Sequence, residues 1–284
     1  MAIPSSVTPG AAPDAEDRLA GAPNFRSVAA LPAADGRRLR SRRLFRSDML
    51  ARLTDADVDR LAALRIGTVL DLRRDDERAA APSRWPDAAR PDTLVFDTLP
   101  DLQAVRAGGW RERLADPAFD AEGARAWMLE TYTRMPAALE PAVRAAFVRL
   151  AGTFAVGAPA VPGAPASAPA VLVHCTAGKD RTGFVCAMVL EALEIERDAI
   201  LDDYLESSRR RPPAALARAL VEWAGLPATP RTLDAVEMVA SVRAEFLEAS
   251  LRETERRHGS IAAYLRACGL DDATRDALRD AMLD

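Results

Sequence analysis

The residues best suited to chemistry lie in one stretch, Val171-Leu-Val-His-Cys-Thr-Ala-Gly-Lys-Asp-Arg-Thr-Gly183. A short apolar strand is predicted to end at its histidine, and an apolar helix to begin near Arg181. Gly178 lies between them and permits a tight turn in which successive backbone N–H groups point inward and bind an anion. Because five residues separate Cys175 from Arg181, this loop can close over one tetrahedral oxyanion with both side chains facing it.

The side chains of the loop suit phosphate chemistry. Helix N-termini and cationic neighbours lower a cysteine pKa from about 8.5 into roughly the 3.5–7.5 range, so Cys175 is expected to react as a thiolate without a separate base. Arg181 offers a planar fork that matches two phosphate oxygens. Lys179 adds a point charge for a second phosphate or for charge in the transition state. Thr182 is expected to donate its hydroxyl to the cysteine sulfur, and His174 to fix the loop backbone.

The predicted reaction is hydrolysis of a phosphate monoester in two displacements. A covalent phosphocysteine at Cys175 would turn one difficult displacement into two easier ones. Preorganised loop donors would stabilise the equatorial oxygens in both steps. The predicted phosphate ligands are Thr176, Ala177, Gly178, Lys179, Asp180, Arg181 and Thr182.

Rare residues gather at this loop. Among 38 lysines and arginines, Lys179 is the one lysine, and His174 is one of two histidines. Such a concentration suggests that their chemistry is needed there. Two histidines and three scattered cysteines give no plausible zinc cluster and no disulfide framework, so we predict no metal, no cofactor and a reducing compartment.

Composition limits the remaining classes of function. A net charge of −4 argues against a general nucleic-acid binder, and no run of 18 apolar residues predicts a membrane span. Residues 1–22 lack the pattern of a signal peptide and are predicted to form a disordered tail. A cytoplasmic location is favoured over export without a recognisable signal peptide. The sequence indicates no particular oligomeric state.

Hydrophobic patterning predicts an α/β fold. Strands are expected at 43–47, 68–72, 94–98 and 171–174, and helices at 55–65, 120–135, from 136 to about 150 and 184–193. Further helices are expected at 197–210, 214–224, 233–257, 261–267 and 271–283, with an exposed loop at 157–169. Strands alternating with helices, followed by a helical C-terminal third, predict a mostly parallel central sheet flanked by helices.

The stretch from His174 to Gly183 resembles the active-site motif of the Cys-x5-Arg protein tyrosine phosphatase superfamily. Its Gly-Lys-Asp-Arg-Thr-Gly version is similar to the bacterial branch of the mycobacterial protein tyrosine phosphatase B type. Further matches are Asn24-Phe-Arg26, Arg43-Leu-Phe-Arg-Ser47, Asp71-Leu-Arg73, Leu99-Pro-Asp101, Asp203-Tyr-Leu205, Gly259-Ser260 and Tyr264-Leu265. The resemblance covers the chain from about Asn24 to its end.

This resemblance implies one phosphatase domain over 23–284, with the phosphate loop at the C-terminal edge of the sheet. It implies a phosphorylated protein as substrate, from which the phosphate of phosphotyrosine is removed. Activity on phosphoserine, phosphothreonine or a phosphoinositide often accompanies this activity. It also implies a helical lid over the active site, whose counterpart here is 209–247.

A carboxylic acid must protonate the leaving group, and it should lie opposite the thiolate. Asp101 is the first candidate, because it follows a predicted strand and a Leu-Pro turn and matches the acid proposed for the family. Asp180 is the second. Asp71 is the third and could instead pair with an arginine at a strand end. Trp85-Pro-Asp87 spells the acid-loop tripeptide of eukaryotic tyrosine phosphatases, but it precedes the 94–98 strand and is interpreted as a surface turn.

Several alternatives stay open or are excluded. A phosphate-binding pseudophosphatase acting as a binding module is the main alternative to an enzyme. A nucleotide-binding loop would need a glycine five residues before Gly178, and a cysteine acyl hydrolase would need a histidine base, for which His258 is the sole candidate. Cys186 is interpreted as a small buried side chain, with oxidative pairing to Cys175 as its alternative.

Overall fold

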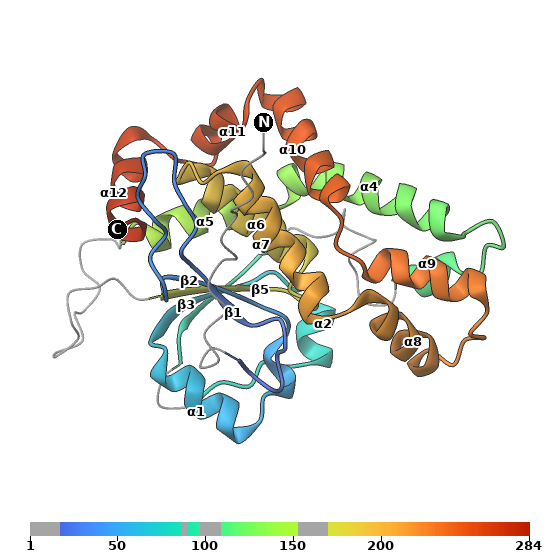
Figure 1. Ribbon diagram of the computed structural model, residues 1–284. Coiled ribbons are helices and arrows are strands. Elements are labelled where there is room, and N and C mark those ends of the chain that lie inside the picture. The colour runs from blue at the N-terminus through green and yellow to red at the C-terminus, as the bar shows by residue number, and fades with distance from the viewer. Residues whose placement is uncertain (1–17, 87–89, 97–108, 153–169) are drawn as a thin grey trace, which may run out of the picture.

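A central β-sheet forms the middle of the fold, with helices packed around it (Figure 1). The computed structural model describes residues 18–86, 90–96, 109–152 and 170–284, and within these ranges five strands form one sheet in the order β1-β2-β5-β3-β4. The strands are β1 (Arg26–Val28), β2 (Leu44–Ser47), β3 (Ile66–Asp71), β4 (Asp92–Val95) and β5 (Ala170–His174). Strands β2, β5, β3 and β4 are parallel, and β1 joins β2 antiparallel. The predicted mostly parallel α/β fold is confirmed.

Helices cover both faces of the sheet (Figure 1). On one side lies α1 (Asp55–Ala63), and on the other lie α5 (Glu140–Leu150), α6 (Asp180–Ala192) and α7 (Arg197–Arg210). The C-terminal third is helical as predicted. The remaining helices are α2 (Asp75–Ala80), α3 (Gly109–Arg113), α4 (Ala121–Ala138), α8 (Pro213–Trp223), α9 (Pro230–Ala240), α10 (Ala244–His258), α11 (Ile261–Ala267) and α12 (Asp272–Met282), together with the short 3-10 turn Leu50–Arg52.

The central strand β5 supplies side chains to two hydrophobic clusters. Val171 and Val173 belong to the larger cluster, while Ala170 and Leu172 belong to the smaller one. This alternation follows from the two-residue period of a strand, and it places one cluster on each face of the sheet. Burial on both faces explains why β5 reads as a continuous apolar run, and it fixes the strand that leads into Cys175.

Local signals fix several boundaries as predicted. Thr54 caps α1, and its side chain and that of Asp57 form a capping box. Helix α1 ends two residues before the predicted boundary at 65. Arg65 takes the left-handed conformation with φ of 53°, and Gly67 lies inside β3.

Three further predictions are corrected. Pro136 does not separate two helices, because α4 continues through it to Ala138 with Pro136 buried. The single helix predicted over 233–257 is two helices, since α9 ends at Ala240 and α10 begins at Ala244. The predicted tail is too long: Leu19 and Ala22 are buried in the smaller hydrophobic cluster. Residues 97–98 of the strand predicted at 94–98 and the 157–169 loop lie outside the described residues.

Asp57 ties the start of the described chain to α1. Its carboxylate accepts backbone N–H bonds from Ala20 (2.8 Å), Gly21 (2.9 Å) and Thr54 (2.9 Å). Burial alone would raise the pKa of Asp57, but the N–H donors of Thr54, Gly21 and Ala20 lower it below its ordinary value. The ionised carboxylate is therefore the form that holds this segment.

Replacing Asp57 with alanine should lower the free energy of unfolding by about 2–3 kcal/mol, because three backbone donors lose a charged acceptor. The matched control is Asp59→Ala, on the exposed face of the same helix, which should change it by less than about 0.5 kcal/mol. Since the folded-state pKa is lowered, the contribution of Asp57 is present above its unfolded pKa of about 3.9 and is lost as the pH falls through the folded value. Urea unfolding at several pH values measures both effects, and equal losses in the two variants would contradict the assignment.

Candidate active site

The phosphate loop joins β5 to α6, at the C-terminal edge of the sheet. The strand ends at His174, and α6 begins at Asp180, so the loop closes at a helix N-terminus. Cys175 is buried, and its Sγ accepts the backbone N–H of Gly178 at 3.2 Å. This contact shows a loop amide directed at the sulfur, as anion-binding loops require.

Gly178 is the one residue type that fits its position. Its φ is +67°, and a Cβ would lie 2.4 Å from the carbonyl oxygen of Ser47 and 2.6 Å from the backbone nitrogen of Asp48. A side chain would therefore strain the turn and push the loop away from the end of β2. The glycine lets the loop pack directly against the neighbouring strand.

Arg181 is buried and held by Glu77 at the loop. Its Nη1 donates to Glu77 Oε2 at 2.7 Å and to the carbonyl of Leu72 at 2.9 Å, and its Nη2 donates to Glu77 Oε1 at 2.9 Å. Thr176 donates its hydroxyl to the same carboxylate. Glu77, at the start of α2, thus orients the guanidinium fork next to Cys175.

The charges of this pair are secured by their contacts. Burial alone would raise the pKa of Glu77, but its hydrogen bond and charge interaction with Arg181 lower it. Burial alone would lower the pKa of Arg181, but Cys175 and Glu77 raise it. Both groups are therefore ionised at neutral pH, and a cation faces the cysteine.

The outward carbonyls of the loop have buried donors. Asn24 Nδ2 donates to the carbonyls of Ala177 (3.1 Å) and Gly178 (2.9 Å), and Arg46 Nη2 donates to that of Gly178 (3.0 Å). Asn24 and Arg46 belong to the two motifs noted near the N-terminus, 24–26 and 43–47. Their role is to hold the outer side of the phosphate loop.

A buried charge cluster supports these donors from behind. Asp203 on α7 binds Arg46 Nη1 at 2.6 Å and Arg26 Nε at 3.2 Å, and Arg26 Nη1 in turn donates to Asn24 Oδ1 at 2.7 Å. Burial alone would raise the pKa of Asp203, but Arg46 and Arg26 lower it. Strands β1 and β2 and helix α7 are thereby tied to one loop.

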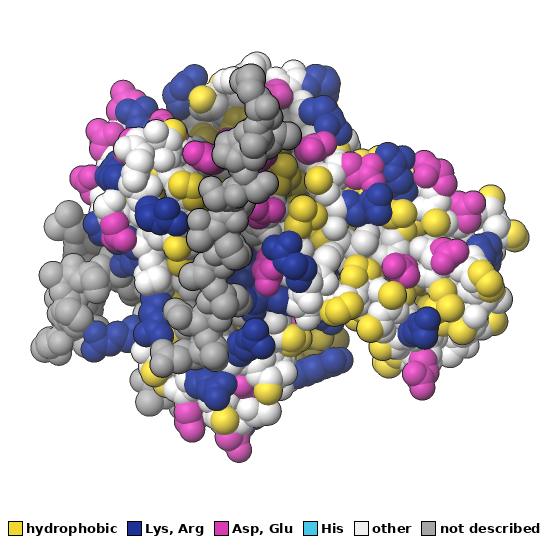
Figure 2. All heavy atoms as spheres, in the orientation of Figure 1, with side chains coloured by type: hydrophobic (Ala, Val, Ile, Leu, Met, Phe, Trp, Pro, Cys, Tyr) yellow, Lys and Arg dark blue, Asp and Glu magenta, His cyan; other side chains and the backbone are white. Residues whose placement is uncertain are grey.

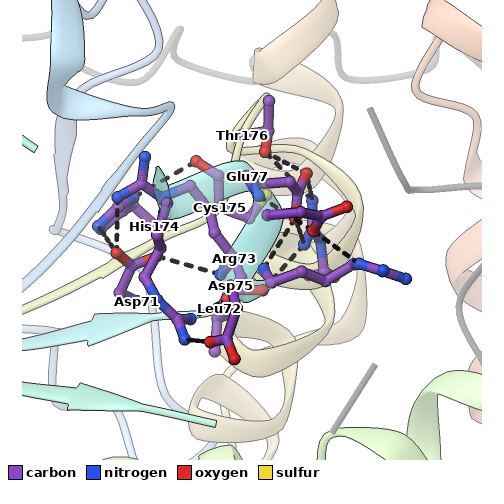
Figure 3. Close-up of polar contacts among 12 residues, drawn as sticks. Asp71, Leu72, Arg73, Asp75, Glu77, His174, Cys175 and Thr176 are labelled. Carbon is purple, nitrogen blue, oxygen red and sulfur yellow. Dashed lines mark hydrogen bonds and ion pairs between the residues drawn. The ribbon is translucent and has the colours of Figure 1, made fainter. Parts of the chain in front are cut away.

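Asp71 holds the end of β3. Its carboxylate binds Arg73 through Nε at 2.9 Å and Nη2 at 2.7 Å, and lies 3.6 Å from Nε2 of His174 (Figure 3). The alternative weighed for Asp71, pairing with an arginine, is the one observed. His174 Nδ1 lies 3.3 Å from the carbonyl of Cys175, and burial lowers the pKa of His174 despite Asp71. A neutral imidazole therefore packs under the loop.

Lys179 and Asp180 point toward the helices and not into open solvent. Lys179 Nζ binds both carboxylate oxygens of Asp180 at 2.8 and 2.7 Å, and the side chain of Lys179 is 11% exposed. Tyr132 on α4 donates its hydroxyl to Asp180 Oδ1 at 2.6 Å. The carboxylate of Asp180 is thus an acceptor for two donors, which suits a positioning role better than proton donation.

The other predicted residues have mixed outcomes. Asp101, the first candidate for the acid, lies outside the described residues, as does Asp87. Thr182 Oγ1 is buried and makes no hydrogen bond within the described part of the chain, to Cys175 or to any other group. Cys186 is buried on α6, and burial raises the pKa of its thiol to about 12, which keeps it protonated.

The described residues contain neither a candidate metal site nor a candidate membrane-spanning helix. No group of three or more histidine, cysteine, aspartate or glutamate side chains in these ranges could hold a metal ion. None of the helices described is both long and apolar enough to span a membrane.

Sequence reasoning missed Glu77 and Tyr132. Both bind loop residues that are distant in sequence, so no local pattern marks them. One feature of the sequence could have indicated a role for Glu77 at the site. Glu77 is an acidic residue on a helix that begins just after the end of a strand.

A mostly parallel sheet that leads into a buried Cys-x5-Arg loop at a helix N-terminus is the arrangement that the resemblance to tyrosine phosphatases predicted. The sequence profile of the tyrosine phosphatase family matches residues 18–284. Three relatives agree. Triple specificity protein phosphatase PtpB of Mycobacterium tuberculosis is 33% identical over 93% of this chain and 98% of its own length. A putative tyrosine-protein phosphatase of Cupriavidus necator is 34% identical over 86% and 80%, and a tyrosine-protein phosphatase of Nostoc commune is 29% identical over 73% and 69%. The chain belongs to the tyrosine phosphatase family.

Replacing Glu77 with glutamine should lower kcat/KM for an aryl phosphate about 10- to 100-fold, because Arg181 loses the charged partner that orients it. The matched control is Asp76→Asn, an exposed neighbour that pairs with Arg74, which should stay within about twofold. Steady-state kinetics on variants shown to be folded by circular dichroism measure the difference. A Glu77→Gln enzyme as active as the control would show that Arg181 is positioned without this pair.

Proposed function

We propose that this protein hydrolyses phosphate monoesters through a phosphocysteine formed on Cys175. The observation that carries the proposal is the buried Sγ of Cys175, which accepts a loop N–H bond while Arg181 is held beside it as a cation. A thiolate is stabilised by cations and by a helix N-terminus, and both features are present here.

In the first step Sγ would attack phosphorus and the bond to the leaving oxygen would break. The leaving oxygen takes a proton from a carboxylic acid, and the phosphoryl group remains on sulfur. In the second step water attacks phosphorus, the S–P bond breaks, and inorganic phosphate leaves. Arg181 and the backbone N–H groups of residues 176–181 would bind the equatorial oxygens in both steps.

The acid is proposed to be Asp101, since the two other candidates are occupied. Asp180 accepts hydrogen bonds from Lys179 and Tyr132, and Asp71 is bound by Arg73. Burial alone would raise the pKa of Asp71, but the hydrogen bonds and charge of Arg73 lower it, so Asp71 is a poor proton donor. Asp180 remains the second candidate because it lies at the loop itself.

The proposed substrate is a phosphorylated protein, with phosphotyrosine first. The relative from Mycobacterium tuberculosis is named a triple specificity phosphatase, and this supports proposing activity on phosphoserine, phosphothreonine or a phosphoinositide as well. We further propose one catalytic domain extending to residue 284, in which 209–247 forms a lid. The alternative of a pseudophosphatase predicts oxyanion binding without turnover.

Replacing Cys175 with serine should abolish turnover of p-nitrophenyl phosphate while the protein still folds and binds vanadate, because a hydroxyl does not ionise usefully at neutral pH. Cys186→Ser, on the helix α6 that follows the loop, is the matched control, and it should keep most of the activity, since its thiol stays protonated. Turnover in the Cys175→Ser enzyme would rule out thiolate catalysis. A parent protein that binds vanadate without turnover would establish the pseudophosphatase instead.

The identity of the acid is tested with two leaving groups. Asp101→Asn should slow an alkyl phosphate at least tenfold more than p-nitrophenyl phosphate, whose leaving group departs almost unaided. The basic limb of its pH–rate profile should flatten, because that limb reports the protonated acid. Asp180→Asn is the comparison and should slow both substrates alike. If Asp180→Asn alone shows the leaving-group dependence, the loop aspartate is the acid and the assignment is reversed.

A further inference from the structure

The α8–α9 hairpin, Pro213–Trp223 and Pro230–Ala240, lies beyond the C-terminal edge of the sheet, on the side toward which β5 runs (Figure 1). Its two helices pack on one another, and α9 also packs on α4. Hydrophobic side chains gather on its outer surface (Figure 2), and Trp223 is 71% exposed. A side chain of the phosphate loop is hydrogen-bonded to the end of this hairpin.

That side chain is Lys179. Its ammonium group donates to the carbonyl of Val239 at 2.9 Å and to that of Ser241 at 3.4 Å, besides its ion pair with Asp180. Val239 lies in the last turn of α9, where carbonyls have no intrahelical partner and the helix dipole is negative. A cation there caps the helix favourably.

The geometry also accounts for the one lysine of the chain. A lysine ammonium has three donors, and here they meet three acceptors from two segments: a carboxylate and two carbonyls. A planar guanidinium spreads its donors in a fixed fork and does not converge on such a compact site. Every other cation of the 38 in this sequence is an arginine, so the exception coincides with the position that requires an ammonium group.

Two buried tyrosines fix the direction of this contact. Tyr132 donates to Asp180, and its hydroxyl lies 2.7 Å from that of Tyr204 on α7. Burial raises the pKa of both tyrosines well above the ordinary value, so both hydroxyls stay protonated. Tyr204 therefore donates to Tyr132, which donates to Asp180, and the carboxylate is aimed at Lys179.

We propose that Lys179 is a positioning residue that fastens the α8–α9 hairpin to the phosphate loop, so that loop occupancy and hairpin order are coupled. Its ammonium donors are used within the protein, and its contribution to phosphate binding is through the backbone. The coupling follows because residues 175–181 surround the oxyanion. Lys179 is one of these residues, and its side chain also binds the end of α9, so ordering of the loop is transmitted to the hairpin. This inference rests on the proposed function only in taking that loop as an oxyanion site.

Hydrogen–deuterium exchange of the amides in 236–242 tests the coupling, without and with vanadate, in the full-length protein. In the parent protein, vanadate should slow this exchange. In Lys179→Met and Lys179→Arg the exchange should be about tenfold faster, the scale of losing a charged hydrogen bond, and vanadate should no longer change it. Tyr132→Phe should shift exchange in the same direction by a smaller factor.

The matched control is Arg252→Met, which removes an exposed cation that pairs with Glu248 on α10 and should behave as the parent does. Exchange in β5 and α6 reports whether each variant is folded. Hairpin exchange in Lys179→Arg within twofold of the parent rate would overturn the proposal. Equal slowing by vanadate in the parent and in Lys179→Arg would also overturn it. So would a parent protein that binds vanadate but shows no slowing of hairpin exchange. If calorimetry shows that the parent does not bind vanadate, the proposed function is contradicted. The positioning role of Lys179 is then tested by the exchange rates of parent and variants measured without vanadate.

Discussion

The structure depends on holding the phosphate loop in its bent conformation. When loop amides point inward toward an anion, the carbonyls point outward into the protein, where an unpaired polar group is costly. Asn24 and Arg46 supply donors to these carbonyls, and Gly178 allows the close approach to Ser47 that brings them within reach. Binding can then proceed without first rebuilding the loop, which is how preorganised donors favour a transition state.

Buried arginines that form ion pairs hold the phosphate loop and its neighbouring elements in place. Arg46, Arg73 and Arg181 are among the largest fully buried side chains, and they pair with Asp203, Asp71 and Glu77 respectively. A buried ion pair contributes little net stability, but removing one partner leaves an uncompensated charge. Two of these pairs join the loop to another element: Arg46–Asp203 links it to α7, and Arg181–Glu77 links it to α2. The third pair, Arg73–Asp71, holds the end of β3 beside His174.

The division of labour within the motif follows from these contacts. Cys175 and Arg181 face the place where an oxyanion would lie, whereas Asp180 and Lys179 turn toward Tyr132 and the end of α9. The two proposals therefore assign both the chemistry and the attachment of the helical hairpin to this one motif. Adjacent residues can do both because the first turn of α6 directs successive side chains to different sides.

Local patterns in the sequence predicted much of this. The apolar run into His174, the capping box of α1 and the boundaries of α7 and α11 each depend on neighbouring residues, and they agree with the structure. The Cys-x5-Arg spacing likewise located the loop. These features are encoded within a few residues, so composition and periodicity suffice to find them.

What was missed depends on contacts between distant segments. Glu77 meets Arg181 from 104 residues away, and Lys179 meets Val239 from 60. The break at 241–243 contains no glycine or proline, and the structure relates it to tertiary contacts, since Ser208 Oγ accepts the N–H of Val242. Lys179 was expected to meet a phosphate because charge alone, without topology, indicates only that an anion is near.

The central claim is that the sulfur of Cys175 takes the phosphoryl group, and trapping that intermediate tests it most directly. Acid quenching during turnover of an aryl phosphate, followed by mass spectrometry of the digested protein, identifies the residue that carries phosphate. The account predicts one phosphoryl group on the peptide that contains Cys175, present only while substrate remains. Turnover with no phosphorylated peptide, or with phosphate on a different side chain, would contradict it.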